Sequence, residues 1–498
     1  MEVSNMKEFF SFKRVTGVVA LMLAVVMLFS GCGSKDTASN NSNLGSEDNQ
    51  TQITSGEENQ STVDGSKDSA TNNSSKSSNK NNSKTNSTKK TTFASDPYSE
   101  ISSSVKSKGV HVLMWRKYTT LEQKLVDGFQ KKTGIKVRTT QTTESEYSTK
   151  LISLIAGGDS PDVVGLGSTN FPGLAIKSLQ TLKTDVYRLD DSCWYKDYMN
   201  AFKVNGKYFS VAMKGAWAAE DTNYVTYYMP KVLKAAGVSE DPWTLYKKGQ
   251  WNWEKQREIA QKVSKKSGYI GISFQNQDLM MYSAGVDFVS YDGNQFKNEL
   301  GNASANSLLT KAWQQTAALQ KDGISSGWAL NNVQQGKVGL FTAIAYGMYN
   351  ANTDAWFTNV PHTSADIKAV PVAGPKGGTA YTPLRPKTWG TAKKAKNPEG
   401  AAFFLRYFLD TKNCDMAGSF YNEQFREVFN KITATGTKKI VMRGQGIVDY
   451  VSSGTYNSKI VNVLSNTTSD QIASKLNSLK GQVTTGMNRA NKELKKVK

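Results

Sequence analysis

Three short runs decide the fold of this chain: VHVLMW at residues 110–115, IKVRT at 135–139 and PDVVGL at 161–166. Each has the apolar or alternating composition that is typical of a strand. Two segments with helical periodicity, 121–129 and 147–155, separate the runs and are followed by glycines. This alternation of strand and helix predicts a parallel α/β sheet, whose ligands bind beyond the carboxyl ends of the strands.

The same region contains motifs of a known family. FQKKTGIKV at 129–137 and AGGDSPDVV at 156–164 resemble the opening of the family 1 extracellular solute-binding proteins, the maltose-binding-protein-like receptors of ABC importers. Further motifs follow in the family's order: NGKYFSV at 205–211, VTYYMPKVLKAAGV at 225–238, GQWNWE at 249–254, DFVSYDGN at 287–294, GKVGLF at 336–341 and NPEGAAFF at 397–404. Each motif is weak alone, but the ordered set covers nearly all of residues 108–498.

The resemblance implies a periplasmic-binding-protein-like (type II) α/β fold with two lobes, a central hinge and a cleft between the lobes. We expect a solute-binding body at 95–498. Its first lobe would comprise about 108–214 and 371–412, and its second lobe about 215–370 and 413–498.

The N-terminus has the features of an export signal. Lys7, Lys13 and Arg14 precede an unbroken apolar run at 18–29, which is shorter than the roughly 20 residues of a bilayer span and fits a signal peptide. Gly31-Cys32 ends a segment that resembles a bacterial lipobox. We therefore predict a signal peptide at 1–31, a lipid anchor on Cys32 and a location on the outer face of the bacterial cytoplasmic membrane.

Residues 32–94 contain few apolar side chains and consist mainly of Ser, Asn, Thr, Lys, Asp and Glu. Such a segment cannot bury enough apolar surface to offset the entropy of ordering it. The composition predicts a disordered tether between the lipidated cysteine and the body.

The charge of the chain lies on the body. The sequence holds 62 Lys and Arg against 42 Asp and Glu, a net charge of +20. Ten basic and nine acidic residues fall within residues 1–94, so the remainder carries +19. Basicity of this size suggests nucleic acid, but an exported protein does not meet it. Two explanations stay open: attraction to anionic membrane and wall polymers, or a basic cleft for an acidic sugar with Arg116 and Arg385 as candidates.

The sequence offers no catalytic apparatus. His111 and His362 are its two histidines, and His111 lies in an apolar strand where packing explains it. No nucleophile elbow, zinc-protease, phosphate-loop or dinucleotide motif is found. An extracellular glycosidase, which needs paired carboxylates, is the remaining enzymatic alternative. We predict no enzyme activity, no catalytic residue, no metal site and no cofactor, and no disulfide between Cys193 and Cys414.

Aromatic residues near strand ends are the candidates for ligand binding. Sugars stack their C–H faces on aromatic rings and bind polar groups through their hydroxyls. Trp115 ends the first strand, with Arg116 and Tyr118 beside it, and Ser168 and Thr169 follow the third strand. Trp217 lies at the first expected lobe crossing, and the family resemblance adds Tyr346 and Trp389. Core packing is the alternative for each aromatic residue.

Together these features predict a substrate-binding lipoprotein of an ABC importer. It would capture a carbohydrate, specifically an oligosaccharide, by hinge closure and deliver it to the permease subunits, acting as a monomer. Two alternatives use the same fold: binding of a non-sugar solute such as an organic acid, and presentation of the ligand to a membrane sensor.

Overall fold

The chain divides into two units, Met1–Thr88 and Lys89–Lys498. The computed structural model describes residues of the second unit: 96–213, 222–349, 357, 360–361, 363–413, 420–444, 446–447 and 460–497. The predicted signal peptide, the lipidated Cys32 and the tether lie outside the described residues, as do Trp217, His362 and Cys414.

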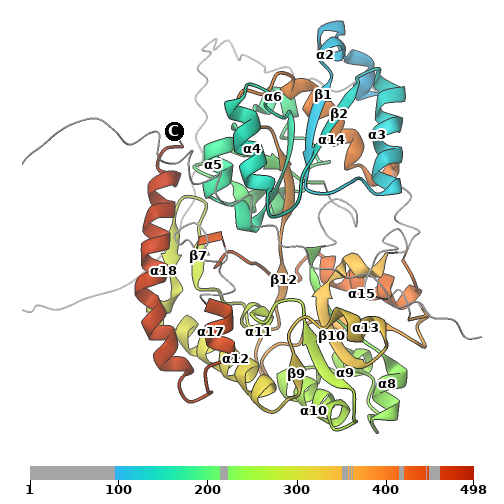
Figure 1. Cartoon of the computed structure of the whole chain (residues 1–498), viewed down its shortest axis with the longest axis vertical. Coiled ribbons are helices and arrows are strands. Elements are labelled where there is room, and N and C mark those ends of the chain that lie inside the picture. Colours follow the sequence, from blue (N-terminus) through green and yellow to red (C-terminus); the bar gives the residue numbers. More distant parts are fainter. Residues whose placement is uncertain are drawn as a thin grey trace, which may run out of the picture. The chain divides into compact units, whose positions relative to one another are not determined.

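The first sheet has five strands in the order β2-β1-β3-β13-β4. Its members are β1 (Val110–Met114), β2 (Val137–Gln141), β3 (Val163–Gly167), β4 (Ser210–Val211) and β13 (Lys387–Gly390). The first three are parallel, and β13 runs antiparallel to both β3 and β4. The runs at 110–115, 135–139 and 161–166 therefore form the predicted parallel strands. β13, from much later in the chain, joins the same sheet (Figure 1).

Helices cover this sheet, and two of them, α3 and α14, begin at capping residues. Thr119 and Glu122 form a reciprocal capping box at the start of α3 (Thr120–Thr133), which ends at Gly134 in the left-handed conformation. Asn397 caps α14 (Pro398–Phe408), which packs against α3 through Phe129 and Phe404. The other helices of this part are η2 (Pro97–Glu100), α2 (Ser103–Lys108), α4 (Tyr147–Ala156), η3 (Ser168–Asn170), α5 (Gly173–Ser178), α6 (Thr184–Tyr187), α7 (Lys196–Met199) and η4 (Asn200–Phe202).

The second sheet also has five strands, in the order β11-β5-β10-β6-β9. These are β5 (Tyr224–Tyr228), β6 (Ile270–Phe274), β9 (Ser325–Ser326), β10 (Val338–Ile344) and β11 (Lys368–Pro371). β5 runs antiparallel to β10 and β11, whereas β6 is parallel to β10 and β9. The architecture is thus mixed α/β with two five-stranded sheets, which agrees with the predicted two-lobed class.

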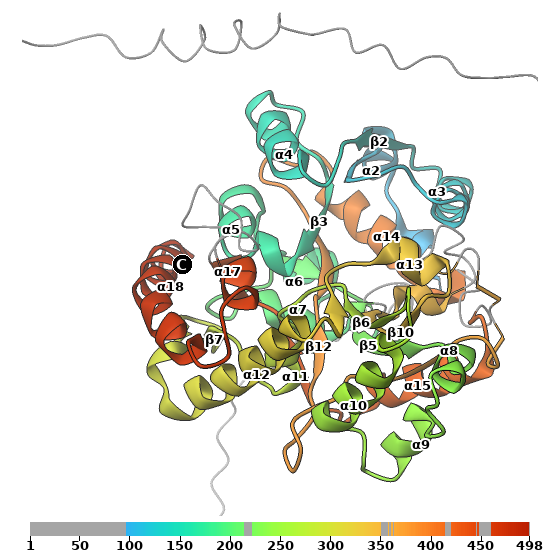
Figure 2. The ribbon, with the colours of Figure 1, turned by 60° about the horizontal axis from the view of Figure 1, so that its bottom comes forward.

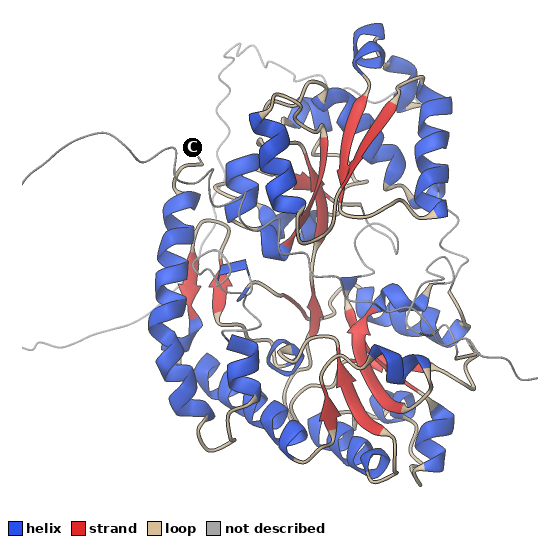
Figure 3. Ribbon diagram, viewed as in Figure 1, coloured by secondary structure: helices blue, strands red, loops and turns tan. Residues whose placement is uncertain are grey.

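Helices surround the second sheet as well (Figure 3). α10 (Trp253–Ser264) packs closely on β6, where a Cβ at Gly271 would lie 2.2 Å from the carbonyl oxygen of Ala260. The remaining elements are α8 (Pro230–Ala235), α9 (Pro242–Lys247), α11 (Leu279–Ser283), β7 (Val289–Tyr291), β8 (Phe296–Asn298), η6 (Glu299–Gly301), α12 (Ala303–Lys321), α13 (Leu330–Gln334), η7 (Ala345–Met348), η8 (Thr411–Asn413), α15 (Glu423–Thr433), α17 (Asn462–Ser465) and α18 (Ile472–Leu494).

The segment that connects the second sheet to the first lies beside a strand from later in the chain. β12 (Thr382–Leu384) follows β11 and leads to β13, and it pairs in parallel with β14 (Lys439–Val441). Leu384 also forms a bridge with Asn223, the residue before β5. The lobe boundaries predicted from the sequence stay predictions.

The long C-terminal helix α18 contacts elements from both parts of the chain. It packs on β8, η6, α12 and α17, and it also touches α5 of the first sheet (Figure 2). None of the helices in the described residues combines the length and the apolar composition needed to cross a bilayer.

Candidate functional site

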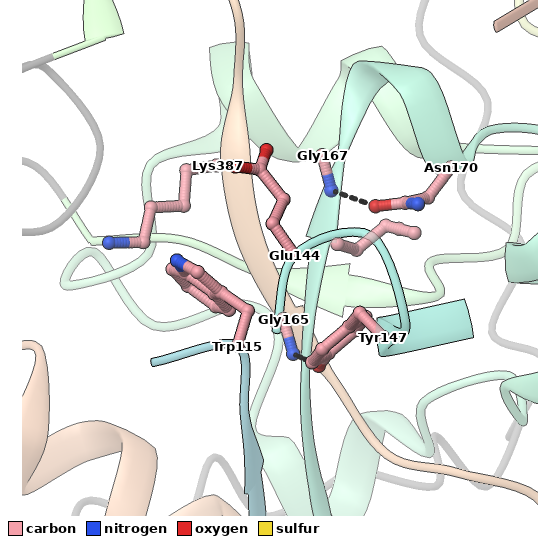
Figure 4. A pocket seen from close by; sticks show the side chains of 8 residues that line it. Trp115, Glu144, Tyr147, Gly165, Gly167, Asn170 and Lys387 are labelled. Atoms are coloured by element: carbon pink, nitrogen blue, oxygen red, sulfur yellow. Dashed lines mark hydrogen bonds between the residues drawn. The ribbon is translucent and has the colours of Figure 1, made fainter. Parts of the chain in front are cut away.

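A hollow of about 250 Å³ lies where the strands of the first sheet end. Trp115 follows β1, Glu144 follows β2, and Lys387 begins the antiparallel strand β13, so all three reach the same edge. This is the edge at which a parallel sheet is expected to bind its ligand. The residues around the hollow are Trp115, Glu144, Tyr147, Gly165, Leu166, Gly167, Asn170 and Lys387 (Figure 4).

The indole of Trp115 is held by its neighbours. It lies against Gly165, where a Cβ would come within 2.6 Å of the indole Cζ3 atom. The ring centre of Trp389 is 5.5 Å away, and that of Tyr147 is 6.0 Å away in an edge-on arrangement. Trp389 is 1% exposed, whereas Trp115 is half-buried. Trp389 therefore supports the hollow from the core, and Trp115 forms part of its wall.

Tyr147 fixes the strand that carries Gly165. Its hydroxyl accepts a hydrogen bond from the backbone N–H of Gly165 at 2.8 Å and donates one to the carbonyl oxygen of Leu113 at 3.3 Å. Burial raises the pKa of this phenol well above its ordinary value. The neutral hydroxyl of Tyr147 therefore links β3 to β1. This link fixes the position of Gly165, against which Trp115 packs.

Polar groups of three kinds surround the indole. The Lys387 ammonium lies 5.0 Å from the ring centre of Trp115 and 5.7 Å from that of Trp389, within the range of a cation–π contact. Asn170 accepts a hydrogen bond from the N–H of Gly167 at 3.1 Å, which orients its amide at the end of β3. Glu144 adds an exposed carboxylate. An apolar wall with a few polar groups is the usual composition of a small-molecule site.

Arg116 and Tyr118, two predicted ligand residues, have other contacts. Both terminal nitrogens of Arg116 donate to the carboxylate of Glu122, at 2.5 and 2.8 Å, and Glu122 is fully buried. The Tyr118 hydroxyl accepts a hydrogen bond from Thr139 at 3.2 Å, and burial raises its pKa to about 12. Neither residue lines the hollow, because the start of α3 and the edge strand β2 engage their side chains.

The other predicted site residues occupy different places. Ser168 is buried at the start of η3, where its carbonyl oxygen accepts the N–H of Phe171. Thr169 belongs to the same turn, and Trp217 lies outside the described residues. Tyr346 is half-buried in η7, after β10 of the second sheet, and does not line this hollow. Ligand contacts for all eight predicted residues stay predictions.

Sequence reasoning missed Lys387, Glu144, Tyr147 and Asn170. A signal existed for Lys387, because residues two apart in a strand share a face and Trp389 was already a candidate. Tyr147 opens the segment 147–155, whose helical periodicity predicts only a packing role for it. Glu144 follows a strand end, as Trp115 does, but an exposed acidic loop residue has no distinguishing pattern.

His111 has the packing role that we predicted. It is 5% exposed, its Nε2 lies 2.8 Å from the Thr140 hydroxyl, and its Nδ1 accepts a hydrogen bond from Arg138 at 2.8 Å. Burial, and next the Arg138 charge, lower its pKa. Among the described residues, no group of three or more His, Cys, Asp or Glu side chains could hold a metal ion.

Comparison with known proteins agrees with this architecture. The model of a family described as bacterial extracellular solute-binding protein matches residues 116–413. An ABC substrate-binding protein from Listeria monocytogenes in complex with cycloalternan has a TM-score of 0.56 at 17% identity, over 76% of this chain and 98% of that one. No curated protein sequence matches the chain significantly.

A second solved structure is that of the galacto-N-biose-/lacto-N-biose I-binding protein of an ABC transporter from Bifidobacterium longum, in complex with lacto-N-biose. It has a TM-score of 0.57 at 14% identity and covers 77% of this chain and 97% of that one. At these identities the likeness shows the fold, which is the predicted periplasmic-binding-protein-like one. The matched family consists of binding proteins, in agreement with the prediction that the chain is not an enzyme.

Proposed function

Because the chain belongs to the family of bacterial extracellular solute-binding proteins, we propose that it captures a carbohydrate, specifically an oligosaccharide, for an ABC importer. The observation that carries the proposal is the half-buried indole of Trp115, held over Gly165 at a strand-end hollow. The binding proteins of similar fold from Listeria and Bifidobacterium, which hold cycloalternan and lacto-N-biose, support the same ligand class.

In the proposed complex, the C–H face of one sugar ring stacks on Trp115. Its hydroxyls bind the carboxylate of Glu144, the amide of Asn170 and the ammonium of Lys387. The hollow, at about 250 Å³, is smaller than the roughly 300–1,000 Å³ typical of sites that enclose a ligand. The second lobe therefore has to close over the exposed side of the sugar, and the permease recognises the closed form.

The charges around the hollow favour a neutral sugar over an organic acid or an acidic sugar. An anion receptor typically uses a bidentate arginine clamp, but Arg116 already holds Glu122 in that way. Arg385 is the second arginine that the sequence suggested for an acidic sugar. Burial lowers its pKa, but interactions with Tyr224, Asp278 and other groups raise the pKa by more, so that it lies above its ordinary value. The hollow itself has one ammonium and one carboxylate, Lys387 and Glu144.

A thermal-shift screen of the purified protein against oligosaccharides, monosaccharides and organic acids tests the proposal. A ligand at 100 times its Kd should stabilise the fold by about 2.7 kcal/mol. Trp115→Ala should abolish the shift. Ile152→Ala, which removes an exposed apolar side chain of α4 outside the hollow, should retain it. If an organic acid shifts the melting temperature and no sugar does, the proposal is wrong.

The proposal includes a lipid anchor. Cys32 would carry the acyl chains after removal of residues 1–31, and residues 32–94 would tether the body to the outer face of the cytoplasmic membrane. Metabolic labelling with a palmitate analogue tests this point separately. Labelling should disappear in Cys32→Ala and persist in Cys193→Ala; release of the unlabelled wild-type protein into the medium would contradict the anchor.

A further inference from the structure

A second groove, of about 570 Å³, lies outside the sugar hollow and shares no residue with it. α5, the turn before β4 and the C-terminal end of α18 form its walls. We refer to it as the α5–α18 groove. Its apolar part consists of four buried side chains: Ile176, Leu179, Phe209 and Val497.

Backbone contacts hold these distant segments together. The ammonium of Lys393 donates to the carbonyl oxygen of Ile176 at 2.8 Å, and the N–H of Lys393 donates to that of Ser178 at 2.8 Å. The side-chain amide of Asn205 donates to the carbonyl oxygen of Val497 at 2.7 Å, which attaches the end of the chain to the same region. These hydrogen bonds therefore fix the walls of the α5–α18 groove relative to one another.

Four lysines line this groove: Lys177, Lys207, Lys393 and Lys496. Glu493 is the single carboxylate among the lining residues, and it pairs with Lys496 at 2.7 Å. A neighbouring hollow, which includes Asn205 from the same turn, adds Lys492 and Lys495. Like charges gathered at one place repel each other unless an anion lies between them.

We propose that the α5–α18 groove binds a polyanionic chain with repeating phosphodiester groups, of the type found in anionic polymers of a cell envelope. Lysine ammonium groups match phosphate oxygens as point charges, and the apolar floor suits the carbon backbone between successive phosphates. A concave groove with an apolar floor accepts a flexible strand better than the flat surface of a bilayer. The binding would retain the receptor near the polymer and leave the sugar hollow open.

The test measures binding of fluorescent poly(glycerol phosphate) to the protein by anisotropy at fixed salt. The variant Lys177→Gln/Lys207→Gln should weaken binding by about fivefold or more and make it less salt-dependent, because fewer counter-ions are released. The matched control Lys248→Gln/Lys265→Gln removes the same charge from exposed sites outside the groove and should change the affinity by less than about twofold.

Equal weakening in both variants would overturn the proposal, because net charge alone would then explain the binding. Stronger binding to phosphatidylglycerol vesicles than to the polymer, lost in the groove variant, would also overturn it in favour of a membrane surface. Melting temperatures within the error of the wild type show that both variants are folded. Competition by unlabelled polymer, but not by neutral dextran, would support binding of the polymer through its charge.

Discussion

Gly165 is the residue on which the position of the Trp115 indole depends. Gly165 pairs with Trp389 of β13, its N–H is bonded to Tyr147, and the preceding residue pairs with β1, so the backbone cannot retreat from an added methyl group. In Gly165→Ala the new Cβ would lie 2.6 Å from the indole, and the indole must therefore move. We expect a loss of sugar affinity of about tenfold or more, measured by titration calorimetry.

Gly481 provides the control for that substitution. It is an exposed residue inside α18, and a Cβ there meets nothing within 4 Å. Gly481→Ala should stabilise the protein by up to about 1 kcal/mol, since alanine favours a helix, and leave the affinity unchanged. If Gly165→Ala binds the sugar as tightly as the wild type does, Trp115 is not the residue on which the sugar stacks.

His111 makes stability depend on pH. The folded protein holds its pKa below the ordinary value, through burial first and the charge of Arg138 next, whereas the unfolded chain titrates near 6.5. As the pH falls below about 6.5, the unfolded chain binds a proton that the folded protein does not, so the free energy of unfolding decreases. His111→Gln should lose less stability than the wild type between pH 7.5 and 5.0 in urea titrations; Asp287, whose pKa burial raises to about 7, acts in the opposite direction but is present in both proteins. An identical pH dependence in wild type and His111→Gln would refute this account.

At the level of single residues, the sequence indicated two aromatic residues that the structure brings together, although their ligand contacts stay predictions. Trp115 was a candidate because it ends a strand, and Trp389 because of the family resemblance. The sequence did not indicate that Arg116 is engaged within the protein, where Glu122, the last residue of a Thr-x-x-Glu capping box, accepts hydrogen bonds from both of its terminal nitrogens. That pattern was visible in the sequence, but the competition for Arg116 depends on how the loop folds.

Asn397 joins four elements around the first sheet. Its side chain caps α14 through the N–H of Gly400 and donates to the carbonyl oxygens of Val105 and Gly109. Its own N–H donates to Asp162, which also accepts the N–H of His111 at the start of β1. Asn397 thus connects the start of β1 with α14, the helix that follows β13.

Asn397→Ala should cost about 2–4 kcal/mol of unfolding free energy, because it removes a cap and leaves two carbonyl oxygens in the interior with fewer donors. Asn252→Ala removes the cap of α10, a single bond to Lys255, and should cost about 1 kcal/mol. Chemical denaturation of both variants measures the difference. Equal losses would mean that the bonds from Asn397 to Val105 and Gly109 contribute nothing.

At the level of elements, local periodicity predicted β1, β2, β3 and the helices between them. It did not predict that β13 inserts between β3 and β4, because that pairing joins residues more than 170 positions apart. A four-residue strand has no local pattern that identifies its partners, and only the family resemblance indicated a return to the first lobe.

At the scale of the whole molecule, the proposed function requires motion about the crossing segments. Asn223 lies there, fully buried, beside Leu384 of β12. Its side-chain amide donates to the hydroxyl of Tyr198 on α7, and its carbonyl oxygen accepts the N–H of Ala345 in η7. One residue therefore connects the surroundings of both sheets, and rotation of one sheet against the other has to occur around it.

Energy transfer between two dyes can detect the proposed closure. In a chain without Cys32, Cys193 and Cys414, dyes at Lys150→Cys on α4 and Lys321→Cys on α12 would report on the separation of the two lobes, and both positions are exposed. Transfer should change when the sugar binds, over the same concentration range as the thermal shift, because closure moves the lobes together. Dyes at Lys124→Cys and Lys150→Cys, both on helices of the first sheet, should show no change. Sugar binding without any change between the lobes would mean that the ligand occupies the hollow at Trp115 without closure, and the permease would then have to recognise the sugar-bound open form.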